Sequence, residues 1–334
     1  MPIILKSCTE LIKIFSKRQP TSVVVVTSRR VAKILPQTIA EIQNSTKIPI
    51  KIVYIPDSEF AKEWNELEKL LQQFIKIGLD KKGMIIALGG GSVGDLVGFA
   101  SAIYQRSVNY IQIPTTLVSQ VDSAHGGKTG VNFSGYKNQI GVINEPVAIV
   151  IDPRLISSLS NEQVIDGLGE IIKAGFIKDV SILRLLEKET VGTLLKSKNL
   201  GMIIHKSIKV KYFHTEGDMK DQGIRQNLNF GHTIGHALEL KYKLSHGKAV
   251  MIGMLEELRI TEKMGLTDFR ERLRLQNLLN KMEIKLPDNL IPDWKAITLD
   301  KKVSGDFVTL PVLKKVGQVE LIIVRVADLK ELFY

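Results

Sequence analysis

Residues 84–94 read MIIALGGGSVG, and this stretch decides the fold. Met84 to Leu88 is an apolar run of strand length, and Gly89 to Gly94 satisfies the pattern G-x-G-x-x-G where a helix is expected to begin. The amides of a helix N-terminus can hold a pyrophosphate, so the stretch is typical of a dinucleotide loop. The alternative is a glycine loop that only tightens a strand-to-helix turn. No acidic residue follows about 20 positions on, which departs from the simplest fingerprint.

On both sides of this stretch, β-branched runs alternate with amphipathic segments. Such alternation predicts βαβ units on a parallel sheet, and therefore an N-terminal α/β domain of Rossmann type over residues 1–158. The expected strands are 22–26, 50–55, 84–88, 108–114 and 147–152, and the expected helices between the first three strands are 31–44 and 59–77.

After Pro153 the apolar residues recur at three-to-four spacing, which predicts a mostly α-helical second domain over residues 159–334. Ser160 with Gln163 has the spacing of a capping box at the start of its first helix. Two late apolar runs, 307–313 and 319–324, predict a small hairpin on this domain. The expected helices are 160–177, 180–198, 202–214, 235–242 and 248–264.

Composition narrows the class of protein further. The 334 residues carry a net charge of +11, with 44% hydrophobic and 24% charged residues, which excludes a collagen and a disordered chain. The single cysteine, Cys8, and the absence of a signal-peptide pattern predict an intracellular protein. The apolar stretch 83–104 is too rich in glycine for a membrane helix, and the basic residues are too scattered for a nucleic-acid patch. We expect the positive field to attract small acidic molecules.

Two further polar segments of the first domain are suited to binding phosphate and hydroxyl groups. Residues 56–59 with Lys62 form a polar turn that can hold a ribose, although a plain helix cap has the same pattern. The sequence 126–129, GGKT, lacks the earlier glycine of a nucleotide-triphosphate loop. The remaining polar residues near it suit phosphate contacts or are ordinary surface charges; they are Asp122, Lys128, Lys137 and Asn138.

A candidate metal site lies in the second domain. Glu170 follows two helical glycines, Gly167 and Gly169, each of which costs about 1 kcal/mol relative to alanine, so another segment is expected to approach closely. His232 and His236 share a helical face, but a zinc-protease motif would need a glutamate where Thr233 stands. A carboxylate with two histidines makes a catalytic divalent-metal site, and the alternatives are core histidines and a surface Glu170–Lys173 pair. His246 is a further candidate.

Taken together, these segments resemble the 3-dehydroquinate synthase family from about residue 23 to residue 313. The resemblance implies an NAD-binding α/β domain, an α-helical metal domain and a homodimer. It also implies conversion of a heptulosonate phosphate into 3-dehydroquinate and phosphate. The matching blocks are GGGSVGDLVGFASAIYQRSVNYIQIPTT, VDSAHGGKTGVNFSGYKNQIG, GLGEIIKAGF, RQNLNFGHTIGHALE, SHGKAV and LDKKVSG.

The resemblance also implies roles for individual residues. The implied metal ligands, for zinc or alternatively cobalt, are Glu170, His232 and His246. The implied NAD contacts are Asp57, Glu59, Lys62, Gly91, Ser92, Val93, Gly94, Asp95, Thr115, Thr116, Lys128, Lys137, Leu155, Ile156, Ser157 and Ser158. The implied substrate contacts are Asp122, Lys128, Asn138, Lys173, Lys211, Arg225, Asn229, His236, Lys301 and Lys302, with Arg106 reaching across the dimer.

Two positions depart from the family pattern, and three rival functions remain. Ser28 stands where an aspartate is common, and Lys248 where glutamate is usual. A sister sugar-phosphate cyclase would act on a substrate that lacks a carboxylate. The resemblance assigns Lys211 and Arg225 to binding that carboxylate, which argues against this rival. A polyol or glycerol-phosphate dehydrogenase would accumulate NADH. A nucleic-acid binder would need no metal. We expect a cytoplasmic enzyme with NAD and one divalent metal, without nucleic-acid or membrane partners.

Overall fold

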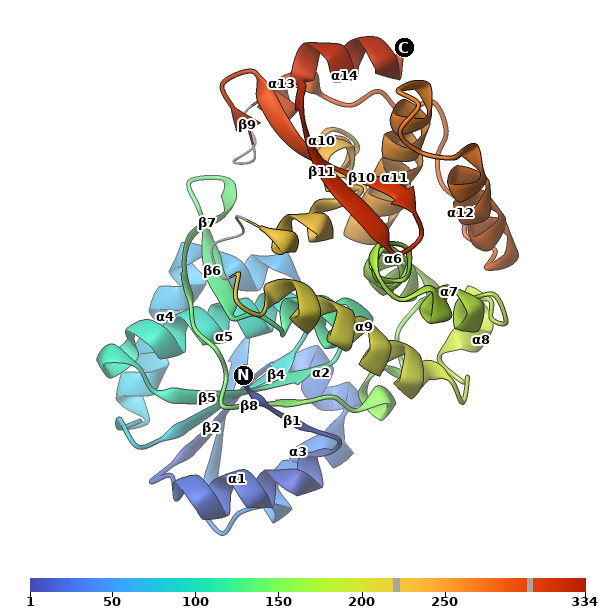
Figure 1. Cartoon of the computed structure of the whole chain (residues 1–334). Helices are drawn as coiled ribbons and strands as arrows, with labels where there is room; N and C mark the ends of the chain where they lie inside the picture. Colours follow the sequence, from blue (N-terminus) through green and yellow to red (C-terminus); the bar gives the residue numbers. More distant parts are fainter. Residues whose placement is uncertain (219–222, 299–302) are drawn as a thin grey trace. The chain divides into compact units, whose positions relative to one another are not determined.

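A computed structural model describes residues 1–218, 223–298 and 303–334 of the protein. The chain divides into two compact units, Met1–Ser158 and Leu159–Tyr334. The first unit contains a parallel sheet with helices around it, and the second is mostly helical (Figure 1).

The first unit is built on six strands in the order β1-β8-β5-β4-β2-β3, with every neighbouring pair parallel. Every residue of β2 and β4 is buried, as expected of a sheet covered on both faces. The predicted parallel α/β fold is confirmed, and β1 is an addition that the sequence did not suggest. The strands are β1 (Ile3–Leu5), β2 (Val23–Ser28), β3 (Ile50–Ile55), β4 (Met84–Gly89), β5 (Asn109–Pro114) and β8 (Ala148–Val150).

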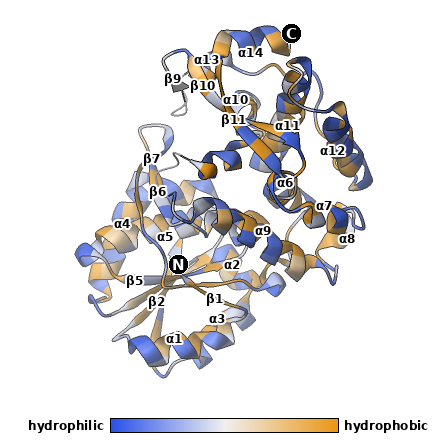
Figure 2. Cartoon of the chain, in the orientation of Figure 1, coloured by the Kyte–Doolittle hydropathy of each residue, from blue (hydrophilic) through white to orange (hydrophobic). Residues whose placement is uncertain are grey.

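Two hydrophobic clusters fill the two faces of this sheet. Val24 and Val26 of β2 pack in the cluster that includes residues of α4 and α5, while Val23 and Val25 pack in the cluster that includes residues of α1. The surface helix α4 shows both colours in Figure 2 because its apolar stripe faces the core. The helices of this unit are α1 (Leu11–Arg18), α2 (Arg29–Ile34), α3 (Pro36–Asn44), α4 (Trp64–Lys76) and α5 (Gly91–Ile103).

Several predicted segments of the first unit have different limits. The single helix expected over residues 31–44 is wrong, because Pro36 lacks an N–H and begins a new helix. The helix expected over 59–77 is preceded by a separate 3₁₀ turn, Glu59–Lys62. An antiparallel hairpin was missed altogether; it consists of β6 (Lys128–Phe133) and β7 (Tyr136–Ile143).

The strand order places a switch point between β2 and β4, because β3 lies on one side of β2 and β5 lies on the far side of β4. Loops that follow parallel strands meet at the carboxyl edge of a sheet, where α/β proteins bind their ligands. The glycine loop after β4 therefore opens at this edge. Among the described residues no helix is long and apolar enough to cross a membrane, and the stretch 83–104 forms mainly β4 and α5.

The second unit begins with the predicted capping box, since the Ser160 hydroxyl accepts from the Gln163 amide and the Gln163 side chain bonds back. The single helix expected over 180–198 is wrong; it is two helices, because Thr190 caps a new one. The helices are α6 (Asn161–Ile177), α7 (Val180–Leu186), α8 (Val191–Leu194), α9 (Leu200–Thr215), α10 (His232–Tyr242), α11 (His246–Lys263), α12 (Phe269–Lys281), α13 (Trp294–Thr298) and α14 (Val326–Phe333).

The predicted hairpin of this unit is confirmed as β10 (Phe307–Lys315) paired with β11 (Gln318–Arg325), and the short β9 (Val303–Ser304) adds a third strand. The inner face of the hairpin packs with residues of α10, α11, α13 and α14. Helices α10 and α11 each begin a few residues earlier than predicted. The consequence is that His232 and His246 are the first residues of two packed helices.

Candidate active site

Three side chains from three helices of the second unit converge on one point. Glu170 lies in α6, while His232 and His246 begin α10 and α11. The Glu170 Oε1 atom lies 3.4 Å from His232 Nε2 and 3.2 Å from His246 Nε2. One carboxylate oxygen and two imidazole nitrogens within 4.8 Å of one another are a donor set that fits a divalent metal such as zinc.

Glycines allow the helices to approach closely enough for this convergence. A Cβ on Gly169 would lie 2.7 Å from the Cα of Gly247, so α6 and α11 touch through their backbones. A Cβ on Gly253 would overlap the Gly231 carbonyl oxygen, and one on Gly235 would lie 2.7 Å from the Ala249 oxygen. The close approach expected at Gly169 is therefore confirmed, and its partner is the helix that carries His246.

Neighbouring groups orient the candidate ligands. His232 Nδ1 lies 3.1 Å from the Phe230 carbonyl oxygen, which accepts its hydrogen and leaves Nε2 for a metal. The second oxygen of Glu170 lies 2.5 Å from Lys173 Nζ, and both side chains are buried. The exposed ion pair considered as an alternative is therefore wrong, because the pair is part of the interior.

The ionisation of this cluster follows from its neighbours. Burial opposes the charge on Glu170, but Lys173 and the two histidines hold the pKa of Glu170 well below its ordinary value. Burial, together with the Lys173 ammonium, holds the pKa of His232 well below its ordinary value. For His246 burial acts in the same direction, but the hydrogen bonds to Glu170 and Glu239 outweigh it and raise the pKa to about 10. Glu170 is thus an anion and His232 a neutral donor.

Two acidic residues around the cluster had not been predicted from the sequence. Glu239 of α10 contacts His246 Nδ1 at 3.1 Å. Glu257 of α11 is fully buried and accepts from the Gly231 amide at 2.7 Å and the Thr233 amide at 3.1 Å, so it caps α10. Glu257 is four residues beyond Gly253 in α11, and no local pattern distinguishes it in the sequence.

The predicted substrate residues of the second unit lie in three places. His236 adjoins the cluster, with its ring centroid 5.0 Å from that of His232. Burial lowers the pKa of His214, and the charges of Lys178, Lys173 and Lys211 lower it further. Lys173 and Lys211 therefore both lie near His214. Arg225 is buried and donates from its backbone N–H to Asp218 at 3.1 Å, in the 3₁₀ segment Ile224–Asn229 that ends with Asn229. Lys301 and Lys302 lie outside the described residues.

In the first unit the glycine loop begins α5, with Gly90 as its cap and Gly91 as its first residue. A Cβ on Gly90 would lie 3.1 Å from Thr116 Cγ2, and one on Gly91 would lie 2.8 Å from Ser123 Oγ. The Ser123 hydroxyl is buried and has no hydrogen-bond partner among the described residues. A helix N-terminus beside a buried unpaired hydroxyl fits a phosphate-bearing cofactor, and Ser123 was missed because serine alone is no signal.

A polar network spans the predicted NAD residues. Lys62 is buried and donates to Asp95 Oδ2 at 2.7 Å and to the Asn138 side-chain oxygen. Glu59 accepts from the Ser92 hydroxyl at 3.0 Å. Burial raises the pKa of Asp95, and Lys62 only partly offsets this effect. Asn138, expected to bind substrate, thus lies in one network with Lys62, Asp95, Glu59 and Ser92, which were expected to bind NAD.

The other predicted residues of this unit differ in exposure. Asp57 is exposed and pairs with Arg30 at 3.6 Å, and the Thr115 amide donates to the Gly89 oxygen at 2.9 Å. Ser28 caps α2 by accepting from the Val31 amide at 3.1 Å. Asp122 is half-buried in the π-helical turn Ser119–Ser123. The buried residues are Val93, Gly94, Leu155 and Ile156, and the exposed ones are Lys128, Lys137, Ser157 and Ser158.

Arg106 lies apart from the other predicted residues of its unit. It is exposed, has a φ of +61°, and follows the C-terminal end of α5, whereas Gly91 begins that helix. Thirteen helical residues span about 20 Å, so Arg106 and the glycine loop lie at opposite ends. Gln105 and Ser107 beside it also have positive φ, at +46° and +92°.

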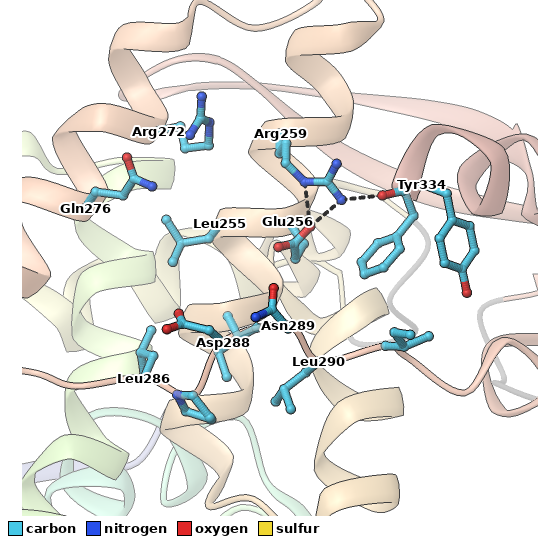
Figure 3. A pocket seen from close by; sticks show the side chains of 14 residues that line it. Leu255, Glu256, Arg259, Arg272, Gln276, Leu286, Asp288, Asn289, Leu290 and Tyr334 are labelled. Carbon is cyan, nitrogen blue, oxygen red and sulfur yellow. Dashed lines mark hydrogen bonds and ion pairs between the residues drawn. The ribbon is translucent and has the colours of Figure 1, made fainter.

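A cavity of about 510 Å³ lies elsewhere in the second unit, between α11, α12, the segment 286–291 and the last two residues (Figure 3). Its two arginines are paired, since Arg259 contacts Glu256 at 2.6 Å and the Phe333 carbonyl at 2.7 Å, and Arg272 contacts Glu262 at 3.0 Å. None of the predicted site residues lines this cavity.

The fold, a parallel α/β unit followed by a helical unit, is shared with solved structures of cyclitol-forming synthases and of iron-containing alcohol dehydrogenases. A 2-deoxy-scyllo-inosose synthase complexed with carbaglucose-6-phosphate, NAD+ and Co2+ matches with a TM-score of 0.86, 24% identity and coverage of 99% of this chain and 95% of that one. A 2-epi-5-epi-valiolone synthase from Streptomyces hygroscopicus, with NAD+ and Zn2+ bound, matches with a TM-score of 0.86, 21% identity and the same coverage. An iron-containing alcohol dehydrogenase from Thermotoga maritima reaches 0.66 at 13% identity, covering 99% of this chain and 96% of that one.

Sequence comparison gives the family. The model of the 3-dehydroquinate synthase N-terminal domain matches residues 52–166, and that of the C-terminal domain matches residues 167–303. The 3-dehydroquinate synthase of Clostridium kluyveri is 38% identical over 97% of this chain and 91% of its own length. That of Streptococcus sanguinis is 34% identical over 94% and 90%. The chain belongs to the 3-dehydroquinate synthase family.

Proposed function

We propose that the chain carries out the reaction of its family, the conversion of 3-deoxy-arabino-heptulosonate 7-phosphate into 3-dehydroquinate and phosphate. The observation that carries this proposal is the convergence of Glu170, His232 and His246 in a chain whose relatives are 3-dehydroquinate synthases. The enzyme is then a carbon–oxygen lyase that acts on a phosphate ester. Its place is in aromatic amino-acid biosynthesis, through the shikimate and chorismate route.

Two groups complete the proposed site. The ion is held by Glu170, His232 and His246, with zinc as the first choice and cobalt as an alternative, because the similar structures carry Zn2+ or Co2+ together with NAD+. When bound, NAD+ would supply a reversible hydride acceptor for a transient oxidation of the substrate, and the ion would supply a Lewis acid for the hydroxyl group that is oxidised. The Phe230 carbonyl keeps the His232 Nε2 atom available throughout.

The chain's cations hold the substrate. A sugar acid phosphate carries a phosphate and a carboxylate, and Lys173 and Lys211 give the neighbourhood of His214 the positive charge that such a ligand needs. Arg225 is assigned to the carboxylate together with Lys211, since guanidinium binds carboxylate with two parallel hydrogen bonds. The remaining assigned contacts are Asp122, Lys128, Asn138, Asn229, His236, Lys301 and Lys302.

The first unit binds NAD at the carboxyl edge of its sheet. The first amides of α5 would hold the pyrophosphate, and Thr116 borders Gly90. Lys62 and Glu59 keep the loop after β3 tied to α5 through Asp95 and Ser92, which leaves a rigid floor for the cofactor. The other assigned contacts are Asp57, Val93, Gly94, Thr115, Lys128, Lys137, Leu155, Ile156, Ser157 and Ser158.

A homodimer in the cytoplasm is part of the proposal. Arg106 lies at the far end of α5 from the glycine loop, which supports a role at the substrate phosphate of a second copy. The cytoplasmic assignment rests on the one cysteine, Cys8, which is a free buried thiol. Neither a nucleic-acid nor a membrane partner is proposed.

Phosphate release tests the proposed reaction. The metal-loaded chain, given the heptulosonate phosphate and NAD+ far below the substrate concentration, should release phosphate without building up NADH absorbance. Formation of NADH in an amount equal to that of the product would indicate a dehydrogenase. Arg225→Ala should lose at least about tenfold in kcat/KM with unchanged metal content, since a charge-assisted contact contributes roughly 1.5–3 kcal/mol. Preference for a sugar phosphate without a carboxylate would indicate a sister cyclase.

A further inference from the structure

Glu239 lies beside the candidate metal cluster without belonging to the set of Glu170, His232 and His246. Its Oε2 atom lies 3.1 Å from Nδ1 of His246, and its side chain is 19% exposed. It stands on α10, whereas His246 begins α11. The contact therefore joins the ligand of one helix to the neighbouring helix.

The two ring nitrogens of His246 face two different carboxylates. Nε2 lies 3.2 Å from Glu170 Oε1, on the side of the cluster, and Nδ1 faces Glu239. A histidine that binds a metal through one nitrogen carries its hydrogen on the other, and an acceptor there fixes both the tautomer and the ring plane. We infer that Glu239 is the positioning residue of His246: it accepts the Nδ1 hydrogen and presents Nε2 to the metal.

His232 provides an internal comparison. Its Nδ1 atom faces the backbone oxygen of Phe230 at 3.1 Å, so the main chain orients this ligand and no substitution removes the acceptor. His246 receives the same kind of support from a side chain. A single substitution at Glu239 can therefore remove the hydrogen-bond acceptor that orients the His246 ring.

A second arrangement of the same atoms leads to a different prediction. His236, Glu239 and His246 also offer three ligand atoms within 4.8 Å of one another, so Glu239 would be a direct ligand of a second ion. Two ions at once would need both nitrogens of His246 to be free of hydrogen, whereas a neutral imidazole carries one N–H. This favours one ion, with Glu239 as hydrogen-bond acceptor.

Metal affinity tests the inference, which rests on the proposed metal centre. Metal-free wild type, Glu239→Gln and Glu239→Ala are titrated with Co2+ and Zn2+ in competition with a chromophoric chelator, and the visible absorption of the Co2+ form is recorded. Glu239→Ala should bind about 10- to 100-fold more weakly with an altered Co2+ spectrum. Glu239→Gln should lie between, because its amide oxygen still accepts the hydrogen. Glu256→Gln is the matched control, since Glu256 is a similarly buried, 26% exposed helix carboxylate in an ion pair.

The outcomes separate the two proposals. Equal affinities and spectra in all four proteins, with only a lower melting temperature in the Glu239 variants, would make Glu239 a packing residue and overturn the inference alone. Two ions per wild-type chain and one in Glu239→Ala would make Glu239 a ligand, which also overturns it. A wild type that binds no divalent ion would overturn the metal centre itself, and with it this inference.

Discussion

Two carboxylates, one in each unit, stand beside a buried lysine and have opposite tendencies to ionise. Glu170 lies 2.5 Å from Lys173, and Asp95 lies 2.7 Å from Lys62. The pKa of Glu170 is well below its ordinary value, although burial opposes this, because Lys173 and two histidines face it. The pKa of Asp95 is raised, because burial dominates and Glu59 and Asp122 add negative charge nearby.

The two settings favour ligands of opposite charge. A carboxylate held as an anion beside the neutral His232 presents a negative charge to a cation. A carboxylate whose charge is paired with a buried lysine adds little net negative charge beside a helix N-terminus, where a phosphate can bind. In the proposed function, the same pair of residue types thus serves a cation site in the helical unit and an anion site in the α/β unit.

The largest effect is expected from His246→Ala, which removes one of the three candidate ligands of the cation site. The variant should lose bound zinc and turnover should fall to background, because only Glu170 and His232 remain as ligands and a catalytic zinc site needs three. Metal content is measured by elemental analysis on the preparation that is assayed. His205→Ala, at an exposed histidine of α9, is the control and should keep both properties. Full zinc in His246→Ala would show that the cluster is not the metal site.

The second prediction concerns the packing that brings the ligands together. Gly253→Ala would place a methyl group against the Gly231 oxygen, and so force α10 away from α11. We expect a loss of about 1–3 kcal/mol in stability, together with weaker metal binding. Gly192→Ala is the matched control, since the nearest atom to its added Cβ is 3.8 Å away. A destabilised Gly253→Ala with wild-type metal affinity would separate the helix packing from the site.

The sequence predicted the parts of the molecule that repeat or follow a local rule. The buried β-branched runs of β2 and β4, and the capping box at Ser160, follow from composition and spacing alone. Gly169 predicted a close contact, and the structure shows that the contacting residue is Gly247. The split between α2 and α3 was missed, although Pro36 is a signal for a helix start.

Other parts depend on contacts that no spacing rule contains. Glu239 and Glu257 are ordinary helix residues in the sequence, and only the packing of α10 on α11 brings them to His246 and to the start of α10. The hairpin of β6 and β7 was missed because its second strand is largely exposed and lacks an apolar alternation. Residue-level spacing paired His232 with His236, whereas the three-dimensional cluster includes Glu170 and His246.

The third prediction is a pH dependence that sharpens the contrast between carboxylates. A raised folded-state pKa means that, above the ordinary value of 3.8, the folded chain binds more protons at Asp95 than the unfolded chain does. Its contribution to stability is therefore present below that pH and is lost as the pH rises. The melting temperature of wild type minus that of Asp95→Asn should fall as the pH rises from about 3 to about 7.

A control of opposite sign is available in the same unit. The Thr21 hydroxyl holds the pKa of Asp80 below its ordinary value. The melting temperature of wild type minus that of Asp80→Asn should therefore rise with pH over the acid part of the same range. Parallel curves for the two variants would contradict the opposite settings assigned to these carboxylates.

The smallest expected effect tests whether the loop of the α/β unit is built for an anion. The Ser123 hydroxyl is buried beside Gly91 without a partner among the described residues, and a buried unpaired hydroxyl costs roughly 1–3 kcal/mol. Ser123→Ala should therefore leave the melting temperature of the cofactor-free chain unchanged or slightly higher. It should weaken NAD+ binding by about tenfold, because the cofactor loses one donor worth about 1.4 kcal/mol. Ser101→Ala is the matched control: this buried hydroxyl of α5 donates to the Gly98 oxygen at 2.9 Å, so its loss should lower stability and leave NAD+ affinity intact. Fluorescence titration with NAD+ and thermal unfolding without it give both quantities for each variant. If Ser123→Ala lowered stability and kept its affinity, the hydroxyl would be part of the folded framework and the loop would have no free donor there.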